Sequence, residues 1–127
     1  MKGTAFLMLL TFLFSSSCAK KQSADDDNVS PVVTISNPVN NQIFNNGQPI
    51  TISGTVTDNV YIAEIHIHIS NSHTGALLMD VHLYPGTNST TFNQSIIAVS
   101  GINYKIQVLA KDRSVNEGLD TILVSCN

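Results

Sequence analysis

The sequence of 127 residues has no tryptophan, and only 12% of its residues are charged. Six lysines and arginines stand against nine aspartates and glutamates, which gives a formal net charge of −3. This balance offers no basic surface to the phosphate backbone of a nucleic acid, so we expect no nucleic-acid partner. The length allows one ordinary domain with a tail and excludes a multidomain enzyme.

Sequence motifs of catalysis are also missing. The chain has no G-x-S-x-G elbow, no H-E-x-x-H and no glycine-rich phosphate loop. In a domain this small, packing uses the interior and leaves little room for a concave substrate pocket. We therefore expect a protein that is not an enzyme and that needs no cofactor.

Residues 1–17 have the composition of a signal peptide. Lys2 gives a positive start, and residues 3–14 form an apolar run that is too short to span a bilayer as a helix. Small serines then precede Cys18, an order that resembles the signal of bacterial lipoproteins, in which this cysteine carries a diacylglycerol. Ser15 departs from that pattern, which usually has an aliphatic residue there. The alternative is an ordinary secretory signal cleaved near Ala19, and under both interpretations the chain leaves the cytoplasm.

Residues 18–30 have the composition of a flexible linker. They are polar and aperiodic, and they include three consecutive aspartates at positions 25–27. An acidic run soon after a lipidated cysteine resembles the export signal of some Bacteroidetes lipoproteins. The resemblance implies a lipid anchor in the outer membrane, with exposure at the cell surface. The alternative is that these aspartates belong to a solvated spacer.

From residue 31 onward, apolar and polar side chains alternate with a period of two. The alternating runs cover residues 32–36, 50–58, 62–70, 76–84, 89–99, 102–110 and 119–126. Short clusters of asparagine, glycine, proline and aspartate separate them. The pattern predicts an all-β, seven-strand antiparallel sandwich over residues 31–127.

Three of these segments resemble bacterial immunoglobulin-like domains of cell-surface proteins. The segments are PVVTIS before Asn37-Pro38, ITISGTVTD at 50–58 and YKIQVLAKD at 104–112. The family often follows the last aspartate with Gly-Asn, whereas this chain has Val115-Asn116. The resemblance implies a lipid-anchored binding or structural module of the bacterial envelope, with a protein or glycan partner.

Physical chemistry also predicts structural roles for single residues. Tyr104 is expected to bury its ring and to bond its hydroxyl to a nearby backbone group. Gly54 and Gly47 are expected at a bulge or turn where a side chain would obstruct the backbone. Cys126 has no partner in the strands that carry an immunoglobulin disulfide, so we expect a small apolar side chain there, with an intermolecular bridge as the alternative.

A candidate metal site arises from histidines that share a strand face. Side chains two residues apart on a strand point to the same side, so His66 and His68 lie opposite the isoleucines between them. In the hairpin we assume, His66 faces Asp80 and Glu64 faces His82. This set could bind Zn²⁺ or Cu²⁺. The alternative is a solvated strand face with ordinary histidine–carboxylate pairing.

A second candidate metal site lies where several loops meet at one end of the sandwich. The residues concerned are Asp26, Asp27, Asn28, Asp58, Asn59, Asp112, Asn116, Glu117 and the loop 85–88. Oxygen donors that converge from separate loops suit Ca²⁺, and cadherin-like relatives bind calcium between domains in this way. The alternative is that Asp58 and Asp112 shape turns through bonds to the backbone.

The opposite end of the sandwich is the candidate binding surface for a macromolecule. Its loops are rich in amides, with Asn40, Asn41, Asn45 and Asn46 as candidate binding residues. Amide-rich loops on a rigid scaffold can recognise glycans or protein backbones by hydrogen bonding.

The first prediction concerns the mature N-terminus. Mass spectrometry of the chain purified from bacterial membranes should find it starting at Cys18, with acyl groups on that residue. A Cys18→Ser variant should carry no lipid and should leave the membrane fraction. An unmodified chain that begins near Ala19 would support the ordinary secretory signal instead.

Overall fold

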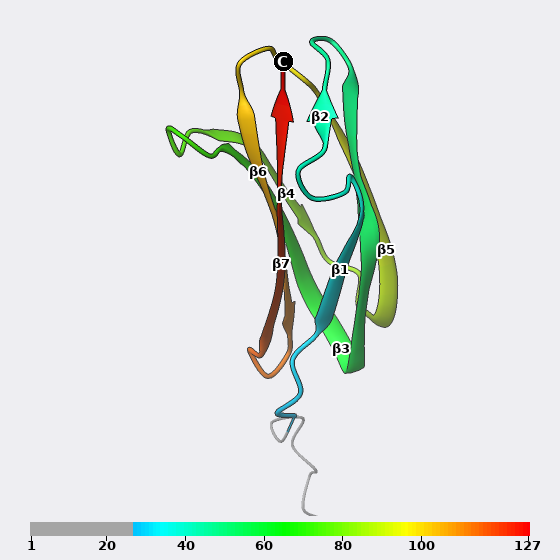
Figure 1. Cartoon of the computed structure of the whole chain (residues 1–127). Helices are drawn as coiled ribbons and strands as arrows, with labels where there is room; N and C mark the ends of the chain where they lie inside the picture. The colour runs from blue at the N-terminus through cyan, green and yellow to red at the C-terminus, as the bar shows by residue number, and fades with distance from the viewer. Residues whose placement is uncertain (1–26) are drawn as a thin grey trace, which may run out of the picture.

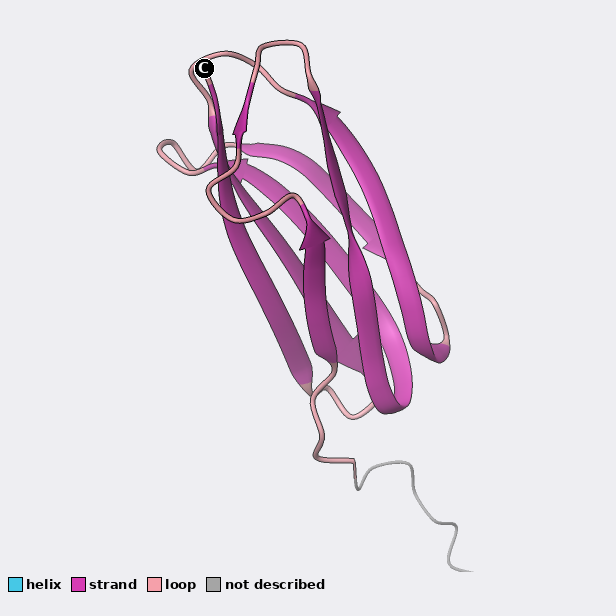
Figure 2. Cartoon of the chain, turned by 45° about the vertical axis from the view of Figure 1, so that its right-hand side comes forward, coloured by secondary structure: helices cyan, strands magenta, loops and turns pink. Residues whose placement is uncertain are grey.

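The computed structural model describes residues 27–127 and contains only strands, turns and loops within them. The predicted signal peptide, Cys18 and the first part of the linker lie outside the described residues. The strands are β1 (Val32–Asn37), β2 (Ile43–Phe44), β3 (Pro49–Asn71), β4 (Leu77–Leu83), β5 (Thr87–Ile97), β6 (Asn103–Asp112) and β7 (Glu117–Cys126). They fold into an immunoglobulin-like sandwich, as the alternating pattern predicted (Figures 1 and 2).

Strand β3 belongs to both layers of the sandwich. Its first part pairs with β1 and β5, and its second part pairs with β4 and β6. The outer order continues from β6 to β7 and then to the short β2. Figure 1 shows this long green strand descending through one layer, turning at the lower end and rising through the other.

The structure has seven strands, as the sequence predicted, but two of the predicted strands are merged into one and one observed strand was not predicted. The runs 50–58 and 62–70 form the single strand β3, because no proline or glycine interrupts residues 58–61. At the bend, Asp58 Oδ2 accepts the backbone N–H groups of Val60 (2.9 Å) and Tyr61 (2.7 Å). The carboxylate thus takes the place of a neighbouring strand as the hydrogen-bond acceptor for these two residues. The count returns to seven through β2, which pairs with β7 in the parallel direction. The antiparallel prediction is therefore wrong for that one pair.

The core lies between the layers and follows the alternation of the strands. On β3, Ile65, Ile67 and Ile69 are completely buried, and the intervening residues are only partly buried. Strand β6 buries every second residue from Tyr104 to Asp112. Burial of one large aliphatic side chain contributes roughly 1.5–3 kcal/mol, so the isoleucine face holds the layers together.

Two further predictions about single residues are confirmed. Tyr104 is 1% exposed, and its hydroxyl oxygen accepts the backbone N–H of Val99 at 2.8 Å. Cys126 is buried and unpaired at the end of β7. Since its side chain is 4% exposed, the folded chain offers little access for an intermolecular bridge.

Gly54 allows β1 to approach β3 closely. A Cβ atom at this position would lie 2.0 Å from the carbonyl oxygen of Thr34 and 2.6 Å from the ring of Phe92. The register between β1 and β3 shifts next to it, between Ile35 and Asn37. Gly54 therefore stands where a side chain would obstruct the backbone, as predicted. Gly47 lies in a turn with a left-handed backbone (φ 81°), but a Cβ atom there would meet nothing within 4 Å, so the predicted obstruction is wrong for that residue.

Replacing Gly54 should test this close approach. A Gly54→Ala substitution places a methyl group against backbone rather than against a flexible side chain, so we expect a loss of about 3 kcal/mol of unfolding free energy. Thr55→Ala, at the exposed neighbouring position, should change it by less than about 1 kcal/mol. Urea denaturation followed by far-ultraviolet circular dichroism measures both. Equal stability of the two variants would contradict the proposed constraint.

Candidate functional site

The sandwich has two poles that differ in chemistry. We call the end that contains Asp27, the β3 bend and the β4–β5 and β6–β7 connections the proximal pole. The other end, with the segment 38–48 and the β3–β4 and β5–β6 turns, is the distal pole. Figure 1 shows the described chain entering at the proximal pole and ending at the distal pole. The predicted grouping of loops is confirmed by hydrogen bonds that join Asp27 to Asn59 (2.9 Å) and Asn116 (2.8 Å).

At the proximal pole, three aspartates from separate segments meet. Asp27, Asp58 and Asp112 offer carboxylate oxygens that lie within 4.8 Å of one another. Asp112 is only 5% exposed and accepts hydrogen bonds from Asn116 through both of its oxygens. Asp26 lies outside the described residues, and the predicted donor Glu117 forms an ion pair with Lys111 at 2.8 Å instead.

Three of the six carboxylate oxygens of these aspartates accept backbone N–H groups. Asp58 Oδ2 holds the β3 bend, and Asp112 Oδ1 accepts the Asn116 N–H at 2.8 Å in the β6–β7 turn. Asp58 Oδ1 is different, because it is buried and has no hydrogen-bond partner. The turn-forming role is therefore visible at this pole, and calcium binding there stays a prediction.

The histidines gather on the outer face of the β4–β3–β6 layer. In the observed register His66 faces His82, and His68 faces Asp80. The assumed pairing of His66 with Asp80 is wrong by two residues, because the turn after Asn71 and a register shift between Ile69 and Ser70 set the observed register. A shift of two keeps every side chain on its predicted face, so the cluster still forms.

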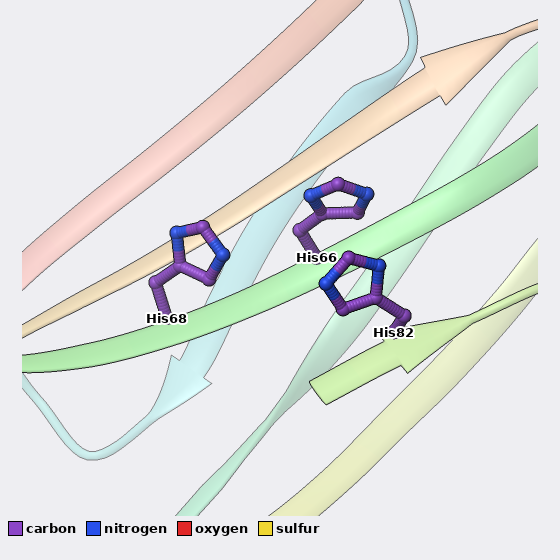
Figure 3. Close-up of side chains that lie close together, drawn as sticks. All are labelled: His66, His68 and His82. Carbon is purple, nitrogen blue, oxygen red and sulfur yellow. The ribbon is translucent and has the colours of Figure 1, made fainter. Parts of the chain in front are cut away.

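The three imidazoles lie close together (Figure 3). The ring centroids of His66 and His82 are 4.0 Å apart, and those of His66 and His68 are 5.8 Å apart. Asp80 Oδ1 contacts Nε2 of both His68 (3.0 Å) and His82 (3.1 Å). Glu64 Oε1 contacts His66 Nε2 at 2.5 Å and His82 Nδ1 at 3.1 Å. We call these five residues the histidine face.

The neighbouring side chains change the pKa of the Glu64 carboxyl. Its contact with His66, followed by the bond from His82, holds the pKa of the Glu64 carboxyl below its usual range, although burial acts in the opposite direction. The Glu64 carboxylate in turn raises the pKa of Tyr84 through a hydrogen bond to the phenol. The histidine face is thus an electrostatically coupled group of side chains.

The distal pole contains a shallow pocket of about 360 Å³. Its lining comprises Asn41, Ile43, Ser72, His73, Asn103, Leu123, Val124 and Ser125. The lining combines amides and hydroxyls with three apolar side chains, of which Ile43 and Leu123 are 61% and 45% exposed and Val124 is buried. Segments that lie far apart in the sequence come together here, and local sequence patterns carry no signal of such a meeting.

The four asparagines predicted at this pole have different roles. Asn40 Oδ1 accepts the Leu123 N–H at 2.9 Å, and Asn46 Oδ1 accepts the Ser100 N–H at 3.1 Å, so both fasten loops to the sandwich. Asn41 lines the pocket and adopts a left-handed backbone conformation (φ 65°). Asn45 is exposed in the turn that its carbonyl closes with Gln48.

The family of the chain follows from a direct match. A model of the bacterial Ig domain matches residues 31–108, and the chain belongs to this family. A comparison with curated protein sequences found no match.

Solved structures share the fold. The fibronectin(III)-like modules of CbhA from Clostridium thermocellum are 19% identical, with a TM-score of 0.56, over 78% of this chain and 47% of theirs. OgpA from Akkermansia muciniphila is 12% identical, with a TM-score of 0.53, over 76% of this chain and 29% of its own. The superoxide reductase (neelaredoxin) from Ignicoccus hospitalis is 12% identical, with a TM-score of 0.51, over 78% of this chain and 81% of its own.

These similarities concern the fold alone, because the identities are low. The chain spans about half the length of the CbhA structure. Within residues 27–127, no helix has the length and apolar character needed to cross a membrane.

The lowered pKa of Glu64 predicts a pH effect. Because the folded carboxyl binds its proton at a lower pH than the unfolded one, Glu64 stabilises the fold above about pH 4.5, and this contribution is lost as the pH falls through the folded pKa. Nuclear magnetic resonance titration should place the Glu64 midpoint below 4.5. A His66→Gln/His82→Gln variant should move it upward, and His73→Gln should leave it unchanged. An unshifted midpoint in the parent chain would refute the coupling.

Proposed function

We propose that this immunoglobulin-like chain is a binding module of the bacterial cell envelope, anchored in the outer membrane through a lipid on Cys18. Its partner is an envelope or surface protein or a glycan that binds at the distal pole. The role is one of binding and presentation rather than catalysis. The observation that carries the proposal is the mixed polar and apolar pocket at the pole opposite the entry of the N-terminal segment.

The position of the N-terminal segment supports this orientation, in which the distal pole points away from the membrane. Residue 27 lies at the proximal pole, where its side chain bonds to Asn59 and its carbonyl to Asn116. The residues between Cys18 and Asp27 precede that pole directly in sequence. An anchor on Cys18 would therefore hold the proximal pole nearer the membrane and direct the distal pole away from it. Several acyl chains on one cysteine would bind a membrane firmly, at about 0.8 kcal/mol per buried CH₂.

The composition of the pocket supports recognition of polar, partly apolar surfaces. Asn41 and the hydroxyl side chains offer both donors and acceptors, whereas Ile43 and Leu123 present exposed apolar area beside them. Asn103 Nδ2 lies 3.2 Å from His73 Nδ1, so these two groups are already positioned by each other. Backbone bonds from Asn41 N to Leu123 O (2.7 Å) and from Ser125 N to Gln42 O (3.1 Å) hold the pocket wall on β7. Such loops on a rigid scaffold lose little conformational entropy on binding.

Site-specific photo-crosslinking in cells tests the proposal. A photoreactive residue at Ser72, in the distal pole, should yield a defined crosslinked species on intact bacteria, and the same residue at Asn88, near the proximal pole, should not. Both positions are exposed, so the labelled chains differ only in which pole they probe. Adding Asn103→Ala to the Ser72-labelled chain should reduce the crosslink by about tenfold, the effect of one polar contact left unmade. Crosslinks from Asn88 alone, or from neither position, would overturn the proposal.

A further inference from the structure

The side chains of the histidine face are spaced like the ligands of a metal ion. His66, His68 and His82 offer ring nitrogens that lie within 4.8 Å of one another. Figure 3 shows one nitrogen of each ring directed toward the space between the three rings. Neutral imidazole is a preferred ligand of zinc and copper.

Asp80 stands where a fourth ligand would be needed. Its Oδ1 atom lies 3.0 Å from His68 Nε2 and 3.1 Å from His82 Nε2. In a tetrahedral zinc site with bonds of about 2.0–2.1 Å, neighbouring ligand atoms are about 3.3 Å apart. The oxygen and the two nitrogens therefore already have nearly the spacing of ligands around one ion.

Glu64 occupies the position of an orienting carboxylate. Its Oε1 atom lies 3.1 Å from His82 Nδ1, so that nitrogen can donate its proton to Glu64 while Nε2 keeps a lone pair for a metal. The same oxygen lies against His66 Nε2, which is buried and lacks an aligned hydrogen-bond partner. Carboxylates behind metal-bound histidines fix the ring orientation and raise ligand basicity.

The backbone beneath the site is rigid, which separates it from an ordinary solvated strand face. His66 and His68 alternate with Ile65, Ile67 and Ile69, which are fully buried on the other side of β3. The ladder from His66–His82 to His68–Asp80 fixes the spacing between β3 and β4. Imidazoles that bind a metal are neutral, so with two carboxylates such a site would carry a net charge of −2, which complements a divalent cation.

We propose that the histidine face binds one divalent transition-metal ion of the Zn²⁺ or Cu²⁺ class. His66, His68 and His82 are its imidazole ligands, Asp80 supplies an oxygen ligand, and Glu64 is the positioning residue behind His82. Because β4 pairs only with β3 among the described strands, the bound ion would join this edge strand to the centre of the layer.

The test is calorimetric titration of the full chain, purified without a polyhistidine tag, with Zn²⁺ and separately with Cu²⁺. The parent chain should bind one ion per molecule, with copper tighter than zinc. His68→Gln and His82→Gln should each weaken binding at least about 100-fold, and Glu64→Gln about 10–100-fold. His73→Gln is the matched control, since it removes the one histidine of the chain outside the cluster, and it should leave the affinity unchanged.

Two spectroscopic readouts separate a metal site from loss of folding. Far-ultraviolet circular dichroism should be the same for all variants without metal. The Cu²⁺ complex should show electron paramagnetic splitting from imidazole nitrogens in the parent and in His73→Gln, and the splitting should report fewer coordinated nitrogens in His68→Gln. Ca²⁺, which prefers oxygen ligands, should leave the histidine resonances unchanged. Absence of saturable 1:1 binding by the parent, or equal weakening by His73→Gln, would overturn the proposal.

Discussion

The burial of the β3 isoleucines between the two layers is the interaction on which the other features depend. The strand contributes Ile50 and Ile52 from one layer and Ile65, Ile67 and Ile69 from the other, all completely buried. Since neighbouring side chains on a strand point to opposite faces, this burial forces His66 and His68 outward. The same continuous strand also places the bend at Asp58 in the proximal pole. Core packing thereby determines where the polar chemistry of the molecule lies.

The two poles differ because the chain uses its polar side chains differently at each. At the proximal pole, charged oxygens of Asp58 and Asp112 organise a bend and a turn, and few of them remain unbonded. At the distal pole, Asn40 and Asn46 fasten loops, while Asn41 remains beside a pocket. Uncharged amides expose donors and acceptors without the desolvation cost of a charge. This difference supports the proposal that a partner binds at the distal pole.

The sequence predicted the features that depend on the alternation of side chains along a strand and on local turn chemistry. Alternation put the three clustered histidines on one outer face, as observed. The corner of the sandwich predicted the buried ring of Tyr104, and the absence of a disulfide partner predicted a buried Cys126, which the structure confirms. It could not predict that residues 50–58 and 62–70 form one strand, because that depends on how Asp58 satisfies the backbone at the bend. Nor could it predict the parallel pairing of β2 with β7, since two residues have no periodicity.

In the histidine face, the residues that share one side of the sheet could be predicted more reliably than the pairs that they form across the strands. A register error of two residues preserved the face of every side chain, so His66, His68 and His82 still converged. The same error exchanged the partners, and only the true register brings Asp80 between His68 and His82. Had the turn after Asn71 moved the register by one residue, His82 would have pointed to the core face of β4. The register shift between Ile69 and Ser70, next to that turn, therefore determines whether the three imidazoles meet, although neither residue belongs to the cluster.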